Sequence, residues 1–313
     1  MVSDAAMSFT RDCLKGKVAL ITGGGSGIGR GITSRFMELG AQTIIVSRKY
    51  DRVKSTAEEL EKQVGGSCYP VQGDVRDYNA IGKIFDHVME KFNKVDILIN
   101  CAAGNFLAMP DKLSYNAFRT VMEIDAHGSF ICSQHAFNKS FSKIGGGIII
   151  NISMTLHYTG ALLQTHAGTA KAGIDAMTKH LAAEWGPCGV RVNGVAPGPI
   201  AGTAGMSKLG TSKAPVPHGT SKKNDAGDDE LDQLTAFIPL QRLGNQKDIA
   251  NSVVFLCLPE ASFITGHTLV VDGGTWLTAG NFAVLDTAVR KAWVERGKAI
   301  RAIANDTEFT SKL

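Results

Sequence analysis

The octapeptide TGGGSGIG, residues 22–29, lies between a short apolar run at 17–22 and an amphipathic segment that ends at Gly40. The apolar run predicts a buried strand, and the segment after the glycines predicts a helix. Glycines in a strand-to-helix turn let the backbone approach a pyrophosphate, whose charge the unpaired amides of the helix N-terminus can bind. The spacing differs from Gly-x-Gly-x-x-Gly, but the strand, turn and helix together predict a dinucleotide phosphate site.

The same strand signal recurs along the chain, with amphipathic segments between the strands. Seven β-branched runs predict strands, at 17–22, 43–47, 68–72, 95–100, 147–152, 190–196 and 267–272. Strands alternating with helices predict a parallel sheet that is covered on both faces. The expected fold class is therefore α/β, a single doubly wound domain with a seven-stranded parallel sheet.

Composition narrows the class of partner. The chain has 313 residues, 44% of them hydrophobic, which is enough for a large core, and a formal net charge of +4. No lysine and arginine block stands out, so nucleic acid is not favoured, whereas the basic excess suits an anionic substrate. No apolar run reaches the roughly 18 residues of a membrane span, so no membrane span is expected.

Six cysteines are scattered without a Cys-x-x-Cys pair. This pattern argues against a metal site or a disulfide framework and suggests buried thiols in a reducing compartment. The tripeptide SKL at 311–313 is, at a free C-terminus, a peroxisomal address that an import receptor reads. We expect that receptor as a partner, and a peroxisome or a related microbody such as a glycosome as the location.

Basic residues follow the second predicted strand, where an acidic residue would bind a ribose 2′-hydroxyl. Arg48, Lys49 and Arg52 lie about 20 residues after the glycine turn, and no acid ends the strand. A guanidinium matches a 2′-phosphate through charge-assisted, often bidentate hydrogen bonds. This predicts NADP(H) as the cofactor, and the alternative is a solvated basic turn.

The motifs found so far, with others further along, resemble the short-chain dehydrogenase/reductase family. GDV at 73–75, NCAAG at 100–104, Lys171 and PGPIAGT at 197–203 follow TGGGSGIG in the family's order, over residues 17 to about 276. The resemblance implies a Rossmann-type fold and these cofactor contacts: Gly23, Gly25, Ser26, Gly27, Ile28, Gly29, Arg48, Arg52, Asp74, Asn100, Ala102, Gly104, Lys171, Pro197, Gly198, Ile200 and Thr203.

Three positions depart from the pattern of the family. Most members use a serine, a tyrosine and a lysine together, and here Met154 and Ala167 replace the serine and the tyrosine while Lys171 remains. Asp125 replaces a functional asparagine. The chain thereby resembles the branch of the family that reduces 2,4-dienoyl-CoA thioesters with NADPH to 3-enoyl-CoA in β-oxidation of unsaturated fatty acids. The motifs that carry this resemblance are CAAGNFLAMP, EIDAHGSF, HAGTAK, EWGP, APGPI, PLQRLGN and DGGTWLT.

A dienoyl thioester does not need an acid where the tyrosine would lie. Hydride adds at the δ-carbon, charge delocalises to the thioester oxygen, and the proton goes to the α-carbon. We expect Asp125 and Asp272 to orient the water that delivers this proton, with Lys171 holding the ribose and stabilising charge. For Asp272 the alternative is structural, since DGG is common throughout the family. Tyr158 and His166 are alternative acids, although a packing or surface role suits His166 better.

The resemblance also implies contacts to the acyl-CoA substrate. They are Arg76, Phe106, Ser114, Tyr115, Asn116 and Lys208, with Arg76 and Lys208 on phosphates and Phe106 along the acyl chain. Lys208 stands where arginine is expected, so it offers a point charge without bidentate geometry. Two other functions remain open: another enoyl-CoA or ketoacyl reductase of the same fold, or a non-catalytic NADPH-binding protein. The resemblance further implies a homo-oligomer, usually a tetramer.

The predicted domain plan has three parts. An N-terminal extension covers 1–16, the NADP-binding reductase domain 17–280, and a C-terminal helix with the SKL tail 281–313. A polar excursion near 203–237 interrupts the domain and is expected to form a substrate lid. The segment 285–304 places apolar residues on one helical face, which predicts a docked helix. A contact to another subunit or to a CoA phosphate is the alternative.

Overall fold

The structure is a computed structural model, and it describes residues 10, 12–203, 235–279 and 287–306. Seven strands form one parallel sheet in the order β3-β2-β1-β4-β5-β6-β7. Their bounds are β1 Val18–Thr22, β2 Gln42–Ser47, β3 Ser67–Gln72, β4 Ile97–Asn100, β5 Gly147–Ile152, β6 Val190–Pro197 and β7 Thr268–Val271. The expected α/β class and the seven parallel strands are confirmed.

Helices connect the strands and follow the last one. The α-helices are α1 Gly27–Glu38, α2 Tyr50–Val64, α3 Tyr78–Phe92, α4 Tyr115–Met122, α5 Gly128–Ala136, α6 Ser142–Ile144, α7 Leu156–Thr159, α8 Thr165–Trp185, α11 Gln246–Cys257, α12 Thr275–Thr278 and α14 Thr287–Asp306. Two π-helical turns, Glu123–His127 and Phe137–Phe141, continue α4 and α5, and short 3-10 turns lie at Gly186–Cys188 and Pro259–Ala261.

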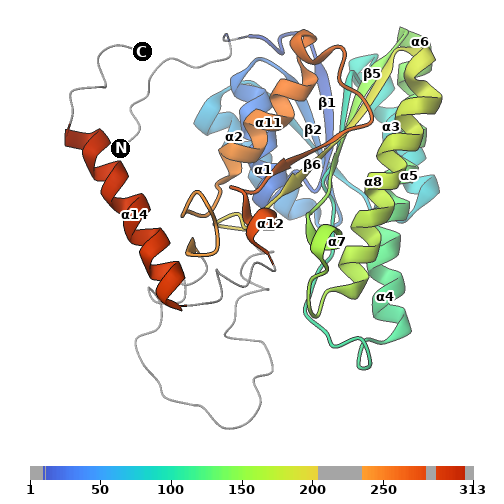
Figure 1. Cartoon of the computed structure of the whole chain (residues 1–313). Coiled ribbons are helices and arrows are strands. Elements are labelled where there is room, and N and C mark those ends of the chain that lie inside the picture. Colours follow the sequence, from blue (N-terminus) through green and yellow to red (C-terminus); the bar gives the residue numbers. More distant parts are fainter. Residues whose placement is uncertain (1–9, 11, 204–234, 280–286, 307–313) are drawn as a thin grey trace. The chain divides into compact units, whose positions relative to one another are not determined.

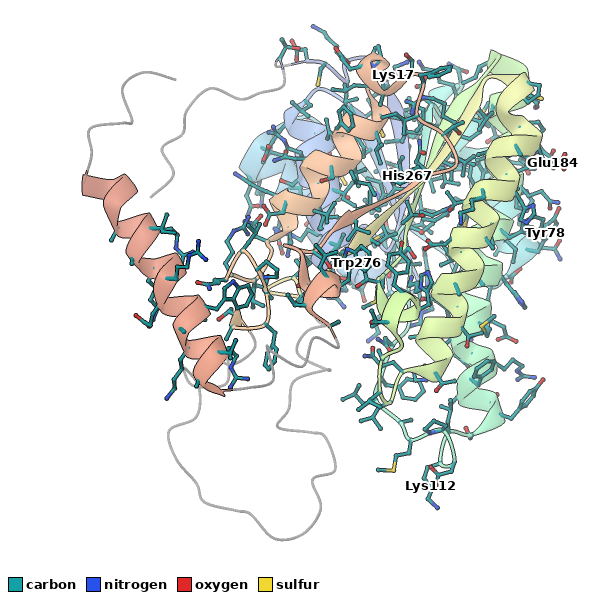
Figure 2. The ribbon with its side chains drawn as sticks, in the orientation of Figure 1. Lys17, Tyr78, Lys112, Glu184, His267 and Trp276 are labelled. Carbon is teal, nitrogen blue, oxygen red and sulfur yellow. The ribbon has the colours of Figure 1, made fainter. Side chains whose placement is uncertain are left out.

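The sheet is covered on both faces, as Figure 1 shows: α1, α2 and α11 lie on one side, and α3, α5 and α8 on the other. Phe36 of α1 and Phe85 of α3 are fully buried in the two apolar layers. Side chains fill the space between the helices and the sheet (Figure 2). Burying each large apolar side chain contributes about 1.5–3 kcal/mol, so the two layers hold the strands in register.

Local signals in the sequence set the helix ends. Asp77 caps α3, since its carboxylate accepts a hydrogen bond from the Ala80 amide at 2.9 Å, and Asn93 ends this helix in the left-handed region. Asn245 and Asp248 form a capping box at the start of α11. These caps satisfy amides that no residue inside the helix can reach.

The chain divides into two compact units, residues 1–215 with 244–271, and residues 216–243 with 272–313. All seven strands belong to the first unit. The predicted three-part plan, with boundaries at 16 and 280, stays a prediction. Most of the polar excursion and the SKL tail lie outside the described residues, so their expected roles stay predictions too.

In the second unit, α14 contacts the segment 237–241. The Arg301 guanidinium donates to Gln241 Oε1 at 2.8 Å, and the Arg290 guanidinium lies 5.0 Å from the centre of the Phe237 ring. Val289 is 48% exposed and Ile300 is 56% exposed. The expected helix is present, and its docking through the apolar face stays a prediction.

All six cysteines are free thiols, and only Cys68, Cys132 and Cys257 are buried. Cys188 is exposed, which corrects the expectation that all of them are buried: it lies in the short 3-10 turn after α8, at the surface.

Among the described residues, no helix is both long and apolar enough to cross a membrane.

Candidate active site

The glycine turn packs tightly against the end of β4. Gly23 and Gly27 have φ angles of 68° and 51°, which favour glycine. A Cβ atom on Gly23 would lie 2.9 Å from the Cys101 carbonyl oxygen, and one on Gly29 would lie 2.3 Å from the Gly23 carbonyl oxygen. Strands β1 and β4 are neighbours although distant in sequence, so the turn lies where the strand order reverses, the usual ligand crevice of such a sheet.

The segment after β6 lies beside this turn. A Cβ atom on Gly27 would be 3.6 Å from Thr203, and the Gly198 amide donates to the Val271 carbonyl at 3.0 Å. The structure therefore brings the two predicted cofactor-binding stretches, 22–29 and 197–203, together. The amides at the start of α1 and the segment 197–203 beside them together fit a dinucleotide phosphate group.

Basic side chains lie where the adenosine end of a dinucleotide would be expected. Arg48 and Arg52 are exposed, and neither forms an ion pair with the described part of the chain. Arg76 forms a two-pronged ion pair with Asp74, with Nε 3.0 Å from Oδ1. The hydrogen bond from Arg76 lowers the pKa of Asp74. Arg48 also lowers the pKa of Asp74, so the predicted adenosine contacts cluster.

A buried ion pair forms the centre of the site. Lys171 Nζ lies 3.0 Å from Asp125 Oδ2 and donates to the Ile152 carbonyl at 3.0 Å. The Gly104 amide donates to Asp125 Oδ1 at 2.7 Å. Asp125 is 1% exposed and Lys171 is 4% exposed. Asp125 lies in the π-helical turn Glu123–His127, a feature often found at functional sites and not predicted from the sequence.

Asn100, the last residue of β4, belongs to a buried polar network whose other members sequence reasoning missed. The Asn100 amide donates to Asn151 Oδ1 at 2.9 Å and to Ser133 Oγ at 3.0 Å, and the Asn151 amide donates to Thr178 Oγ1 at 2.9 Å. Asn151 is fully buried in an otherwise apolar strand. A polar residue within such an apolar strand was the signal that could have identified it.

The replaced family positions lie close to Lys171. Ala167 is 1% exposed and lies one helical turn before Lys171 on the buried face of α8. Met154 follows β5, the strand that ends at Ile152, whose carbonyl binds Lys171. Neither side chain can donate a hydrogen bond, so Lys171 faces a site without the serine and tyrosine hydroxyls.

Asp272 follows β7 and holds the turn into α12. Its Oδ1 accepts from the Gly274 amide at 2.8 Å, and its Oδ2 accepts from the Trp276 amide at 2.8 Å. Both oxygens thus serve a structural role, although each retains a second lone pair for a water molecule. Its expected catalytic role stays a prediction.

The expected substrate residues follow β4, apart from Arg76 and Lys208. The Phe106 ring stacks on His166 with 4.2 Å between ring centres. Ser114 caps α4 by accepting from the Ala117 amide at 3.2 Å, Tyr115 is 79% exposed, and Asn116 accepts from Arg119. Lys208 lies outside the described residues.

Arg76 lines a hollow of about 630 Å³ beside Asp74. Asp77 and Glu123 also line it, so three carboxylates surround one guanidinium that is already paired. A phosphate would be held there only if Arg76 turned away from Asp74. The expected contact between Arg76 and a CoA phosphate stays a prediction.

The Tyr158 hydroxyl is paired with Asp175 of α8. Its hydroxyl donates to Asp175 Oδ2 at 3.3 Å, and the same oxygen lies 2.9 Å from His157 Nε2. Burial, and then the charge of Asp175, raises the pKa of Tyr158 to about 12. A phenol with this pKa and this partner is a poor proton donor near neutral pH.

The sheet order, the glycine turn and the buried lysine define an oxidoreductase that binds a nicotinamide dinucleotide. A family model described as Enoyl-(Acyl carrier protein) reductase matches residues 23–275. The chain therefore belongs to the short-chain dehydrogenase/reductase family.

Relatives within the family have a more specific description. The chain is 49% identical over 273 residues to "Peroxisomal 2,4-dienoyl-CoA reductase [(3E)-enoyl-CoA-producing]" of Pongo abelii, covering 87% of this chain and 88% of the relative. It is 48% identical to the protein of the same name from Danio rerio, covering 87% and 86%. A solved structure of a putative NAD(P) dependent gluconate 5-dehydrogenase from Beutenbergia cavernae, with bound NADP at low occupancy, matches with a TM-score of 0.73 and 30% identity, covering 84% of this chain and 98% of that one.

Proposed function

We propose that this protein reduces 2,4-dienoyl-CoA thioesters to 3-enoyl-CoA with NADPH, in the β-oxidation of unsaturated fatty acids. The observation that carries the proposal is the buried Asp125–Lys171 pair in a site where Met154 and Ala167 replace the two hydroxyl donors. The names of the two relatives described above support the same reaction.

The reaction suits a site without a tyrosine. Bound NADPH supplies the hydride to the δ-carbon, and the α-carbon then needs a proton at a position remote from the hydride acceptor. Asp125 Oδ1 is taken by the Gly104 amide, and Oδ2 contacts Lys171 while keeping lone pairs for a water molecule. In this mechanism Asp125 orients the water, Lys171 stabilises the negative charge, and Asp272 serves as a second acceptor.

The preference for NADPH rests on Arg48 and Arg52. Their guanidinium groups are exposed and unpaired among the described residues, as a 2′-phosphate contact requires. Arg48→Ala should weaken NADPH binding about tenfold and leave NADH binding nearly unchanged, because one charge-assisted contact is lost. Equal loss for both nucleotides in fluorescence titrations would mean that Arg48 does not read the phosphate.

The substrate class can be tested directly by the loss of NADPH absorbance. We expect rapid oxidation with 2,4-hexadienoyl-CoA and little with crotonyl-CoA or acetoacetyl-CoA. Preference for either control substrate would indicate an enoyl-CoA or ketoacyl reductase. No oxidation with any of the three, while NADPH still binds, would indicate a non-catalytic binding protein.

Asp125→Asn tests the proposed water. The amide keeps the shape of the side chain but cannot accept as strongly from water, so turnover should fall by about two orders of magnitude with NADPH still bound. Near-normal turnover of this variant would rule out the water mechanism. Asp272→Asn, measured beside it, would show whether the second carboxylate contributes to turnover or only to the turn before α12.

We also propose a location in peroxisomes or related microbodies, as the names of the relatives suggest. A fluorescent protein fused ahead of residues 304–313 should enter these organelles through the import receptor. The same fusion without residues 311–313 should remain outside them, and import of both fusions would show that SKL is not the address.

A further inference from the structure

Two loops beside the candidate site carry apolar side chains that are not buried. They are the segment 106–109 after β4, with the sequence FLAM, and the segment 161–163 before α8, with the sequence ALL. Met109 is 46% exposed and Leu162 is 90% exposed, and the other five residues are half-buried. Single exposed apolar residues are common on protein surfaces, but a contiguous set indicates a ligand or a partner.

A hydrogen bond and a ring contact hold the two loops side by side. The Ala108 amide donates to the Leu163 carbonyl at 2.9 Å, and the Phe106 ring stacks on His166, the second residue of α8. In Figure 1 the two loops run beside each other between α7 and the start of α4. Residues 106–109 and 161–163 therefore form one apolar surface, which we call the loop patch.

Leu163 has a backbone conformation that leucine rarely adopts. Its φ angle is 64°, in the left-handed region, where a bulky side chain is strained. The hydrogen bond from Ala108 to its carbonyl fixes this conformation, and the residue before it, Leu162, extends into solvent. Strain of this kind is typical of ligand clamps, so the loop patch agrees with a binding role better than with a packing role.

The first loop begins at the buried ion pair. The Gly104 amide donates to Asp125 Oδ1 at 2.7 Å, and the Asn105 side chain donates to Gln164 Oε1 at 2.7 Å. Met109 is five residues beyond Gly104, so it lies at most about 18 Å from it. A molecule that reacts at the ion pair can therefore reach the loop patch with an apolar extension.

The acyl tail of the substrate is the occupant that fits these observations. In a 2,4-dienoyl thioester the hydride goes to the δ-carbon, and the carbons beyond it are apolar and take no part in the reaction. The loop patch contains no charged, hydroxyl or amide side chain, so it suits an alkyl chain and not the phosphates of CoA. Its continuity with the ion pair through Gly104 favours the substrate over a second copy of the chain.

We propose that the loop patch is a distal substrate subsite, which binds the acyl tail beyond the δ-carbon and makes the enzyme select longer dienoyl chains. Met109, Leu162 and Leu163 are its specificity-determining residues. The subsite removes methylene groups of the tail from water, a contact that is equal in the bound substrate and in the transition state. The inference rests on the proposed function, because it requires an acyl-CoA substrate.

Two dienoyl substrates test the subsite in the wild type. In 2,4-hexadienoyl-CoA one carbon lies beyond the δ-carbon, and in 2,4-decadienoyl-CoA five do. We expect kcat/KM to be at least about tenfold higher for the decadienoyl substrate, mainly through a lower KM, because burial of each methylene group is favourable. Equal kcat/KM for the two substrates would overturn the inference.

Two variants make the loop patch polar at nearly constant size. Leu162→Asn and Met109→Gln should each raise KM for 2,4-decadienoyl-CoA about three- to tenfold, and leave kcat and both hexadienoyl constants within about twofold. A general loss of structure would lower kcat for both substrates alike, so the difference between substrates isolates the subsite. An unchanged preference in the combined variant would contradict the proposal.

Leu163→Asn provides a variant that is not expected to fold less well. Asparagine adopts the left-handed region more easily than leucine, and the backbone hydrogen bond from Ala108 remains. The Tm should therefore be no lower than that of the wild type, while the preference for 2,4-decadienoyl-CoA falls. A full preference in this variant would show that the Leu163 side chain does not contact the tail.

Ile144 supplies the matched control. It is 42% exposed and precedes β5, so it lies at the amino end of the strands, opposite the edge where ligands bind. Ile144→Asn should keep the full preference for the decadienoyl substrate. An equal loss in Ile144→Asn and Leu162→Asn would mean that the effect does not belong to the loop patch.

Binding of unreactive thioesters measures the subsite without the reaction. Decanoyl-CoA should inhibit the wild type at about tenfold lower concentration than hexanoyl-CoA, and the combined Met109→Gln and Leu162→Asn variant should lose this difference. A changed oligomeric state of that variant with an unchanged difference would assign the loop patch to a contact between copies of the chain, and would overturn the inference.

The subsite and the proposed function can fail separately. If the wild type oxidises NADPH with neither dienoyl-CoA, the proposed function fails. Normal turnover of 2,4-hexadienoyl-CoA without any gain for 2,4-decadienoyl-CoA means that only the subsite fails.

Discussion

Asp125 and Lys171 are the residues on which the site depends. Their side chains are almost fully buried and lie 3.0 Å apart, so each compensates the charge of the other. Taking two ions out of water is costly, and removing only one of them is costlier still. A pair that is expensive to maintain agrees with a role in chemistry more than with a role in stability.

The Asp125–Lys171 pair also predicts a change in the free energy of unfolding, which can be measured without an activity assay. Lys171→Met should lower the free energy of unfolding by about 3–5 kcal/mol, because it leaves the Asp125 carboxylate buried without a cation. Urea unfolding measures the change. Lys171→Met combined with Asp125→Asn should recover much of the loss, since the orphaned charge is removed.

An exposed lysine provides the control. Lys15 lies 3.9 Å from Asp12, and both side chains are largely exposed. Lys15→Met should change the free energy of unfolding by less than about 1 kcal/mol. Similar losses for the two lysine variants would show that the Asp125–Lys171 pair is not specially dependent on burial.

Tyr158 carries a prediction for alkaline pH. Its pKa is raised from 10.0 to about 12, so the unfolded chain releases this proton at lower pH than the native protein. The stabilising effect is therefore complete below pH 10.0 and is lost as the pH rises towards about 12. The near-ultraviolet phenolate titration of the native wild type, minus that of Tyr158→Phe, should show the late ionisation, and a phenolate appearing with an ordinary pKa would contradict the assignment.

At the scale of elements, the glycine turn is a rigid unit with little space for side chains. In Gly29→Ala the new Cβ atom would lie 2.3 Å from the Gly23 carbonyl oxygen, so the backbone of the turn has to move. We expect NADPH binding to weaken at least about tenfold, because the helix amides no longer meet the phosphate. Isothermal titration with NADPH measures this loss.

A second glycine variant controls for the change of residue type. A Cβ atom on Gly186, at the end of α8, would have no neighbour within 4 Å, and its φ angle is −53°. Gly186→Ala should bind NADPH as the wild type does. Normal binding by Gly29→Ala would mean that the turn is more adaptable than its contacts indicate.

The elements themselves were predictable because their signals are local. β-branched runs predicted all seven strands, and the glycine turn predicted the start of α1. The π-helical turn at Glu123–His127 was not predicted, because a single turn of five residues is too short to show a period of its own. This turn sets the direction of Asp125, so the partner of Lys171 could be suspected from the sequence but not placed.

At the scale of the whole molecule, the predicted cofactor contacts belong to one compact unit. The glycine turn, Arg48 and Lys171 all lie in the unit formed by residues 1–215 and 244–271, whereas α14 belongs to the other unit. A chain that ends at residue 280 should therefore bind NADPH within about threefold of the full chain, since no predicted contact is removed. Fluorescence titration with circular dichroism as a folding check tests this, and loss of binding by a folded truncation would assign the C-terminal residues a part in the cofactor site.

The sequence by itself determined the fold class, the dinucleotide turn and the missing serine and tyrosine, because each depends on a periodicity or a motif within a short stretch. Only the tertiary structure decided that Asp125 pairs with Lys171, that Tyr158 binds Asp175, and that His166 stacks on Phe106. These facts depend on which helices pack against the sheet and at what rotation. Burial and pairing arise between segments that are distant along the chain, and no local pattern of residues encodes them.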